Sequence, residues 1–163
     1  MKIWISTVGW SPFAVINPLW AACFFEEELN FIPEKVVLFN NADQNPKIKK
    51  NLEKVRDWII RILNEYGVDD PIIEPIEAEE RNIIEFKDVF METFKKYKDQ
   101  RVAIDMTPGR KFMSSIAMRI AIVHKVDKLY YLQLWGQEYQ NVPFIQIPFT
   151  NQKLINILEF VNE

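Results

Sequence analysis

The chain has 163 residues, of which 48% are hydrophobic and 26% charged, a composition that suits a globular fold and excludes a disordered tail. Its net charge of -3 argues against an overall positive field, so duplex DNA is not an expected partner. The only cysteine, Cys23, and the only histidine, His124, cannot form an internal disulfide or a Cys/His zinc site, and we expect neither a metal nor a cofactor.

The N-terminal part of the sequence predicts a strand that leads directly into a helix. Lys2–Val8 is a short run rich in β-forming residues. A turn follows it, in which Ser11 suits the N-cap of a helix and Pro12 suits the first helical position. We expect this helix to end at the three consecutive glutamates Glu26–Glu28.

The apolar stretch Pro12–Phe25 also has some features of a lipoprotein signal, because Ala21 and Ala22 precede Cys23. Lys2 is the only basic residue before this stretch, and prolines interrupt it. The stretch is also shorter than the roughly 20 residues that a membrane helix needs. A helix buried beside a sheet accounts for the same residues, so we expect no membrane association and a cytoplasmic protein.

The middle of the sequence predicts two further strands, each followed by a helix. Lys35–Phe39 is short and wholly apolar after its lysine, as buried parallel strands are. Apolar residues then recur at helical spacing over Asn45–Gly67, with lysines and arginines between them. Ile72–Ile76 is expected to be an edge strand because prolines flank and interrupt it. An aromatic stripe then predicts a helix over Glu79–Lys98.

The next segment repeats the alternation of strand and helix. Arg101–Asp105 predicts a compact buried strand, which the polar loop Met106–Lys111 follows at once. A helix rich in alanine, isoleucine and methionine then continues to Lys125. Leu129–Leu134 is the next expected strand.

The C-terminal region, from about residue 128 to residue 163, is expected to form an antiparallel hairpin and a closing helix. A polar connection, Gly136–Pro143, precedes a further expected strand at Phe144–Phe149. This connection is too short to contain a crossover helix, which favours antiparallel pairing. Thr150 is the expected cap of the closing helix.

Together these elements predict an α/β fold with a Rossmann-like, mostly parallel sheet flanked by helices. The strands are too apolar to face water, so we expect helices on both faces of the sheet. We find no internal repeat or linker in the sequence, and we therefore expect one domain over residues 1–163.

The loop that follows the fourth predicted strand is the strongest candidate for a binding site. Ligands of open α/β sheets bind at the carboxyl ends of the strands, where helix N-termini present free backbone N–H groups. Thr107, Pro108, Gly109, Arg110 and Lys111 combine a hydroxyl, a turn and two cations at such a place. Each cation costs a few tenths to about 1 kcal/mol beside the positive end of the helix dipole, unless an anion is bound. The alternative is that both cations extend into solvent.

The loop after the first predicted strand is a second candidate. Thr7 and Ser11 supply hydroxyls, Gly9 permits close backbone approach, and Trp10 offers a ring that can stack on a base. The alternative is that Ser11 only caps the helix and that Trp10 covers the sheet edge. Neither loop has the further glycines that a dinucleotide fingerprint or a P-loop needs.

Two segments together resemble the CARF family, the CRISPR-associated Rossmann-fold domains. They are Ile5–Gly9 and Asp105–Met113, and the family motif at the second reads Asp-x-Thr-Gly-Gly-x-Lys-x-Met. Here Pro108 replaces the first of the two glycines. The resemblance implies a homodimer whose paired loops bind cyclic oligoadenylate, with cyclic tetra-adenylate the expected ring. A chain of this length resembles the stand-alone ring nucleases, which linearise this messenger and end CRISPR type III signalling.

For such a ring nuclease, metal-independent attack by a ribose 2'-OH on its neighbouring phosphodiester is the expected reaction. Lys111, with Arg110, would stabilise the charge that develops on the phosphoryl oxygens, and Ser11 or Thr7 would orient the hydroxyl. His124 lies about 20 Å along the helix from Arg110, at 1.5 Å per residue, so no strong general base is evident and slow turnover is expected. The expected catalytic residues are Lys111 and Ser11. The expected ligand-binding residues are Thr7, Gly9, Trp10, Thr107, Pro108, Gly109 and Arg110.

Two other functions are compatible with the sequence. A non-catalytic sensor of cyclic oligoadenylate, or of another nucleotide, would use the same cavity and act through a partner. An assembly domain would instead use exposed aromatic residues such as Trp58 and Trp135 for contact.

Overall fold

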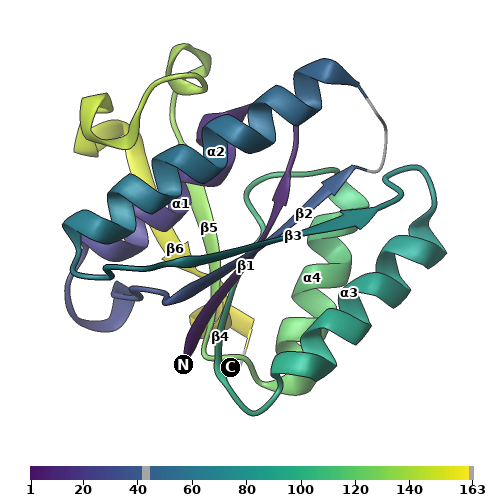
Figure 1. Cartoon of the computed structure of the whole chain (residues 1–163). Helices are drawn as coiled ribbons and strands as arrows, with labels where there is room; N and C mark the ends of the chain where they lie inside the picture. Colours follow the sequence, from purple (N-terminus) through teal and green to yellow (C-terminus); the bar gives the residue numbers. More distant parts are fainter. Residues whose placement is uncertain (42–44, 162–163) are drawn as a thin grey trace.

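The chain folds as an α/β structure, which confirms the predicted class (Figure 1). The computed structural model describes residues 1–41 and 45–161. Over these residues the chain forms a six-stranded sheet with the strand order β3-β2-β1-β4-β5-β6. The strands are β1 Lys2–Val8, β2 Lys35–Asn41, β3 Ile72–Ala78, β4 Arg101–Asp105, β5 Lys128–Leu134 and β6 Gln152–Asn156. The helices are α1 Pro12–Phe24, α2 Pro46–Glu65, α3 Ile83–Tyr97, α4 Lys111–His124 and α5 Leu158–Val161.

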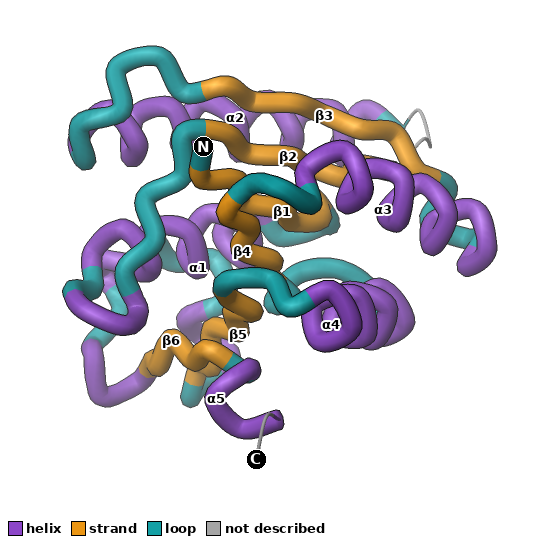
Figure 2. Tube along the Cα trace, turned by 90° about the horizontal axis from the view of Figure 1, so that it is seen from below, coloured by secondary structure: helices purple, strands orange, loops and turns teal. Residues whose placement is uncertain are grey.

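Helices cover both faces of the sheet, as the apolar strands predict. Helices α1 and α2 pack on one face and α3 and α4 on the other (Figure 2). Neighbouring residues of β1 therefore enter two different cores. Trp4 lies on the α1 side, where its ring stacks on Tyr130 with the centroids 5.3 Å apart, and Ile5 lies on the α3 side. Both side chains are fully buried, so neither face of this strand is exposed to solvent.

The parallel part of the sheet agrees with the predicted strands, with small differences at element boundaries that include those of β3 and α3. Strand β3 lies at the edge of the sheet and pairs with β2 alone, as its prolines predict. It extends to Ala78, beyond the predicted end. Helix α3 begins at Ile83 and not at Glu79, because the Asn82 side chain accepts a hydrogen bond from the backbone amide of Glu85 and caps the helix there.

The antiparallel hairpin is confirmed, but the prediction of its second strand is wrong. Residues Phe144–Gln146 form a 3₁₀ turn bounded by prolines, and β6 is Gln152–Asn156. The closing helix is correspondingly short, and Thr150 lies in another 3₁₀ turn rather than at its N-cap. The end of the predicted closing helix, residues 162–163, lies outside the described residues. Buried polar residues in β6 conceal the alternation that would have indicated a strand, since Gln152 donates to two carbonyls of the preceding turn.

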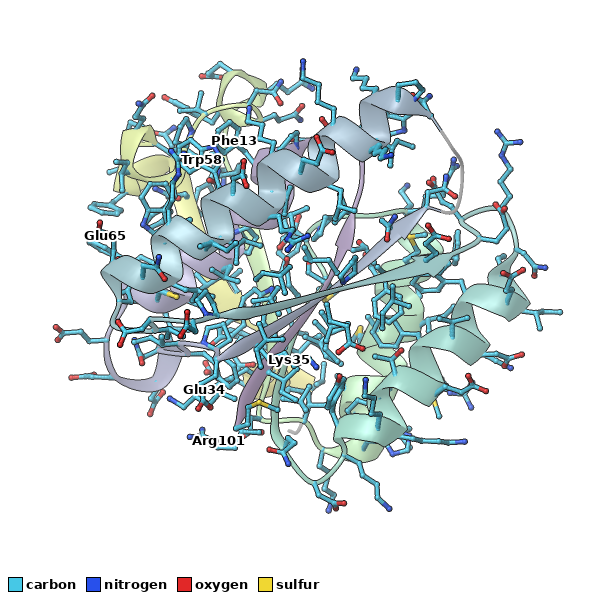
Figure 3. The ribbon with its side chains drawn as sticks, in the orientation of Figure 1. Phe13, Glu34, Lys35, Trp58, Glu65 and Arg101 are labelled. Carbon is cyan, nitrogen blue, oxygen red and sulfur yellow. The ribbon has the colours of Figure 1, made fainter. Side chains whose placement is uncertain are left out.

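The two ends of the sheet differ in character. Figure 3 shows Glu34, Lys35 and Arg101 at the amino-terminal ends of the parallel strands. There Lys35 pairs with Glu74, and Arg101 pairs with Asp127 at 2.9 Å. At the carboxyl ends, β1 lies between β2 and β4 and leads to helix α1, whereas β4 leads to α4 on the opposite face. A crevice is expected at such a point, where the connections leave the sheet in opposite directions.

Candidate ligand-binding cavity

A cavity of about 440 Å³ lies at the carboxyl ends of the parallel strands. Its walls come from the loops that follow β1 and β4, the end of β2, and the connection from β3 to α3. The structure brings eight of the nine predicted site residues together around it: Thr7, Gly9, Trp10, Ser11, Thr107, Pro108, Gly109 and Arg110. Lys111 is not among the lining residues; it is the exposed first residue of α4.

The loop after β1 is held in place by helix α2. The Asn51 side chain donates to the backbone carbonyls of Gly9 and Trp10, at 3.3 and 3.0 Å. The Trp10 ring is 56% exposed, and the Lys47 ammonium group lies 5.1 Å from its centroid. The ring is therefore available at the mouth of the cavity, with a cation beside it.

Ser11 is the N-cap residue of α1, as predicted, but its side chain makes no capping hydrogen bond. Its hydroxyl lies instead 3.2 Å from the Gln140 carbonyl and 3.3 Å from Asn141 Oδ1, and donates toward both. The reason is that the connection between β5 and β6 crosses the start of α1 and supplies these acceptors. Ser11 thus links two segments that are distant in the sequence.

Gly109 fits its position because no side chain has room there. Its φ angle is +91°, in the region that residues with a Cβ rarely adopt. A Cβ atom on Gly109 would lie 2.6 Å from Thr7 Oγ1 and 3.1 Å from Met113 Sδ. The end of β1 and the loop after β4 therefore touch through this glycine, and the backbone of that loop closes on Thr7.

Thr7 has a polar atom without a partner at this contact. The residue is 7% exposed, and within the described part of the chain its hydroxyl makes no hydrogen bond. Buried hydroxyls are nearly always satisfied, and leaving one unsatisfied costs about 1–3 kcal/mol. An unsatisfied hydroxyl in the wall of a cavity is the arrangement expected of a group that meets a ligand.

Asp105 lies beneath the loop that follows β4. Its carboxylate accepts hydrogen bonds from the Ser6 hydroxyl and the Thr107 backbone amide, both at 2.9 Å. Burial raises the pKa of Asp105 to about 7, and the hydrogen bonds from Thr107 and Ser6 oppose this rise. The Thr107 hydroxyl in turn accepts from the backbone amide of Leu132 at 2.9 Å. Asp105 and Thr107 therefore fix the shape of the loop.

Arg110 has a partner that the sequence did not indicate. Its guanidinium group forms an ion pair with Glu80, whose carboxylate also accepts from the Asn41 side chain at 2.9 Å. The Glu80 side chain is 14% exposed, and the Arg110 side chain is 58% exposed. The Glu80 carboxylate therefore offsets the positive charge of Arg110. The sequence had predicted that a bound anion would do so at the start of α4.

Three polar lining residues were not predicted from the sequence: Asn40, Asn41 and Glu80. Asn40 and Asn41 come directly after the predicted strand Lys35–Phe39, and Glu80 falls inside the predicted helix Glu79–Lys98. The Asn40 Oδ1 atom is buried and makes no hydrogen bond within the described residues. The signal that could have indicated all three residues is their place at or just after the carboxyl ends of β2 and β3. The carboxyl ends of parallel strands meet at one edge of the sheet.

The described residues contain neither a cluster of metal ligands nor a helix that could span a membrane. Among residues 1–41 and 45–161, no three His, Cys, Asp or Glu side chains come together as a metal site would require. In the same ranges, no helix has both the length and the apolar character needed to cross a bilayer. His124 ends α4, far from the cavity, and its ring lies 4.9 Å from that of Phe94.

Comparisons with known proteins show similarity of fold. No protein family matches the sequence, and no curated protein matches it. Enterococcus italicus Csm6 bound to cyclic hexa-2'-fluoro-hexa-dAMP has a TM-score of 0.59 and 18% identity, over 98% of this chain and 43% of that chain. Can2 from Sulfobacillus thermosulfidooxidans in complex with cyclic tetra-adenylate has a TM-score of 0.54 and 13% identity, over 80% and 32%. Protein VC1899 from Vibrio cholerae has a TM-score of 0.54 and 11% identity, over 80% and 30%. The chain thus spans less than half the length of each.

Proposed function

We propose that this chain is a CARF-like domain that binds cyclic oligoadenylate at the cavity and cleaves it slowly as a ring nuclease. The observation that carries the proposal is that one cavity collects eight of the predicted residues around the unsatisfied hydroxyl of Thr7. Two of the solved structures with a similar fold hold cyclic oligonucleotides, which supports the same class of ligand. The resemblance of Asp105–Met113 to the family motif supports it independently.

In this proposal a phosphate group lies at the N-terminus of α4. The turn at Gly109 brings backbone N–H groups close to it, and the positive end of the helix dipole favours it. The Thr7 hydroxyl would donate to the phosphate, and Arg110 would exchange Glu80 for it. Trp10 would stack on a base at the mouth of the cavity.

A homodimer completes the proposed site. A closed twofold dimer suits a ring with matching symmetry, because each identical cavity meets an equivalent phosphate and base. Lys111 lies outside the cavity of its own chain, so it would act at the rim, where the ring passes from one subunit to the other. Cyclic tetra-adenylate is the ring that we expect.

Cleavage would proceed without a metal. The 2'-oxygen of one ribose attacks the neighbouring phosphorus, the bond from phosphorus to the 5'-oxygen breaks, and a 2',3'-cyclic phosphate and a 5'-hydroxyl result. The proton of the 2'-hydroxyl passes through solvent to the leaving oxygen. Lys111 and Arg110 would stabilise the phosphoryl charge, and Ser11 would orient the 2'-hydroxyl if the ligand displaces Gln140 and Asn141 from it.

The test is incubation of the pure protein with cyclic tetra-adenylate in EDTA, followed by chromatography of the products. We expect linear products with 2',3'-cyclic phosphate ends, and a rate about 100-fold or more lower in the Lys111→Ala variant. Arg119→Ala is the matched control, because this residue is an exposed cation on the same helix outside the cavity. An unchanged rate in the Lys111 variant would contradict the catalytic role.

A non-catalytic sensor is the second candidate, and two observations favour it. The Ser11 hydroxyl is engaged with Gln140 and Asn141, and Lys111 does not line the cavity. The groups expected to bind therefore line the cavity, whereas the Ser11 hydroxyl is engaged elsewhere and Lys111 lies outside the lining. In the same assay, tight binding of a ring that stays intact would identify a sensor. If the protein binds no oligoadenylate at micromolar concentration, both of these functions are refuted and the role as an assembly domain remains.

A further inference from the structure

The cavity has two chemically different sides. The loops after β1 and β4 supply a hydroxyl, backbone amides and the Arg110 cation, which suit a phosphate. The end of β2 and the connection after β3 supply Asn40, Asn41 and Glu80, whose oxygens are hydrogen-bond acceptors. Acceptors of this kind repel phosphate oxygens and suit the donor groups of a nucleobase.

Asn40 differs from the other two residues on this side because its acceptor has no partner. Asn41 and Glu80 are hydrogen-bonded to each other, and Glu80 also pairs with Arg110. The Asn40 Oδ1 atom is buried without a hydrogen bond among the described residues, in a residue that lines the cavity. A buried amide oxygen loses its hydration on folding, so it gains most from a ligand that supplies an N–H group.

We propose that Asn40 is the residue that selects adenine in this cavity, an inference that rests on the proposed binding of cyclic oligoadenylate. A carboxamide offers one acceptor and one donor in a planar fork. Adenine offers the matching pair, its 6-amino group as donor and N7 as acceptor. The unsatisfied Oδ1 of Asn40 accepts from the amino group, and Nδ2 donates to the ring nitrogen.

The same geometry rejects bases with an oxygen in place of the amino group. Hypoxanthine differs from adenine at this position by a carbonyl oxygen, which would face Oδ1 as a second acceptor. Guanine presents an oxygen at the same place. Asn40 thus distinguishes adenine from the other purines, whereas the phosphate side of the cavity binds every ring alike.

The experiment compares the dissociation constants of cyclic tetra-adenylate and cyclic tetra-inosinate for the wild-type protein and the Asn40→Ala variant. We expect the wild type to prefer the adenylate ring by about 5-fold or more, and the variant to lose that preference. Asn41→Ala is the comparison variant. It removes a hydrogen bond from Glu80 and should change both affinities by the same factor, so its preference should persist.

The thermal midpoint of the free proteins separates base selection from a structural role. Because the Asn40 oxygen is unsatisfied, Asn40→Ala should leave the midpoint unchanged or raise it. A lowered midpoint with the preference retained would assign Asn40 to structure and overturn the inference. Equal affinities of the wild type for both rings would also overturn it. Binding of neither ring would refute the proposed function, and the inference would fall with it.

Discussion

Substitution of Gly109 by alanine tests the contact between the end of β1 and the loop after β4, two of the segments that form the cavity. The φ angle of +91° costs an alanine about 1–2 kcal/mol. The new Cβ atom would also lie 2.6 Å from Thr7 Oγ1, a distance that real Cβ atoms essentially never show. Thr7 is buried and cannot rotate freely, so overpacking adds about 1–3 kcal/mol. We therefore expect Gly109→Ala to lower the free energy of unfolding by about 2–5 kcal/mol.

Substitutions of two other glycines separate the cost of the positive φ angle from the cost of the close approach to Thr7. Gly67 has a φ angle of +84° but nothing within 4 Å of a built Cβ atom, so Gly67→Ala should cost only the backbone contribution. Gly9 also has open space and lacks a positive φ angle, so Gly9→Ala should change stability by less than about 1 kcal/mol. Urea unfolding of the three variants measures these values. For a chain of this size, the expected loss in Gly109→Ala corresponds to a thermal midpoint about 4–20 °C lower.

The result that would refute this reasoning is a Gly109→Ala variant no less stable than Gly67→Ala. The close approach to Thr7 would then carry no energy, and the two loops would not be packed as the structure has them. A loss equal to that of Gly9→Ala would further contradict the strained backbone at Gly109.

Three further predictions concern the groups around the cavity. Because burial raises the pKa of Asp105 to about 7 from its usual value near 3.9, the unfolded chain releases this proton first. The free energy of unfolding should therefore fall as pH rises from about 4 to 7, and Asp105→Asn should flatten this profile. Glu80→Gln removes the carboxylate that pairs with Arg110 and should tighten binding of cyclic tetra-adenylate several-fold at low salt, with a smaller gain at high salt. Asn17 donates to the Val142 carbonyl and accepts from the Phe144 amide, both at 2.9 Å, so Asn17→Ala should cost about 1–3 kcal/mol in urea unfolding.

Each of these predictions has a contrary outcome. A pH profile of Asp105→Asn parallel to that of the wild type would show that another group controls stability between pH 4 and 7. Weaker binding by Glu80→Gln would mean that Glu80 positions Arg110 for the ligand rather than competing with it. Glu79→Gln, at a neighbouring residue that does not line the cavity, is the matched control for this variant. Unchanged stability of Asn17→Ala would mean that the connection after β5 is not held by this residue.

The parallel part of the fold was predictable because its determinants are local. Strands buried on both faces are continuous apolar runs, and α2 carries its core residues at helical spacing. Strand β6 was not predictable in this way. Its buried Gln152 donates to the Phe144 and Ile147 carbonyls, and its buried Asn156 accepts from the Leu129 amide. These partners become visible only when the hairpin has formed.

In the candidate site too, the residues marked by local patterns were predictable and those placed by the sheet were not. Gly9 and Gly109 marked two loops because the chain has only four glycines, and the cations beside Gly109 indicated an anion. Asn40 and Glu80 were missed because their place depends on the sheet register, which pairs Asn40 with Val8 at the end of β1. The partner of Arg110 lies 30 residues away, so no local pattern indicates it.

The pairing of Arg110 with Glu80 determines which groups contribute net affinity for a ligand. A phosphate that replaces the Glu80 carboxylate exchanges one anion for another, so this exchange alone gains little free energy. Net gain must come from groups that lack a partner in the free protein. Among the described residues that line the cavity, these are the Thr7 hydroxyl and the Asn40 amide oxygen. The Trp10 ring, which is exposed although the Lys47 ammonium group lies beside it, adds a third contact surface. They would meet a phosphate, a base edge and a base face, so a ligand must carry both phosphate and base to engage all three. An inorganic phosphate engages only the first, and on this reasoning it should compete poorly with a nucleotide ring.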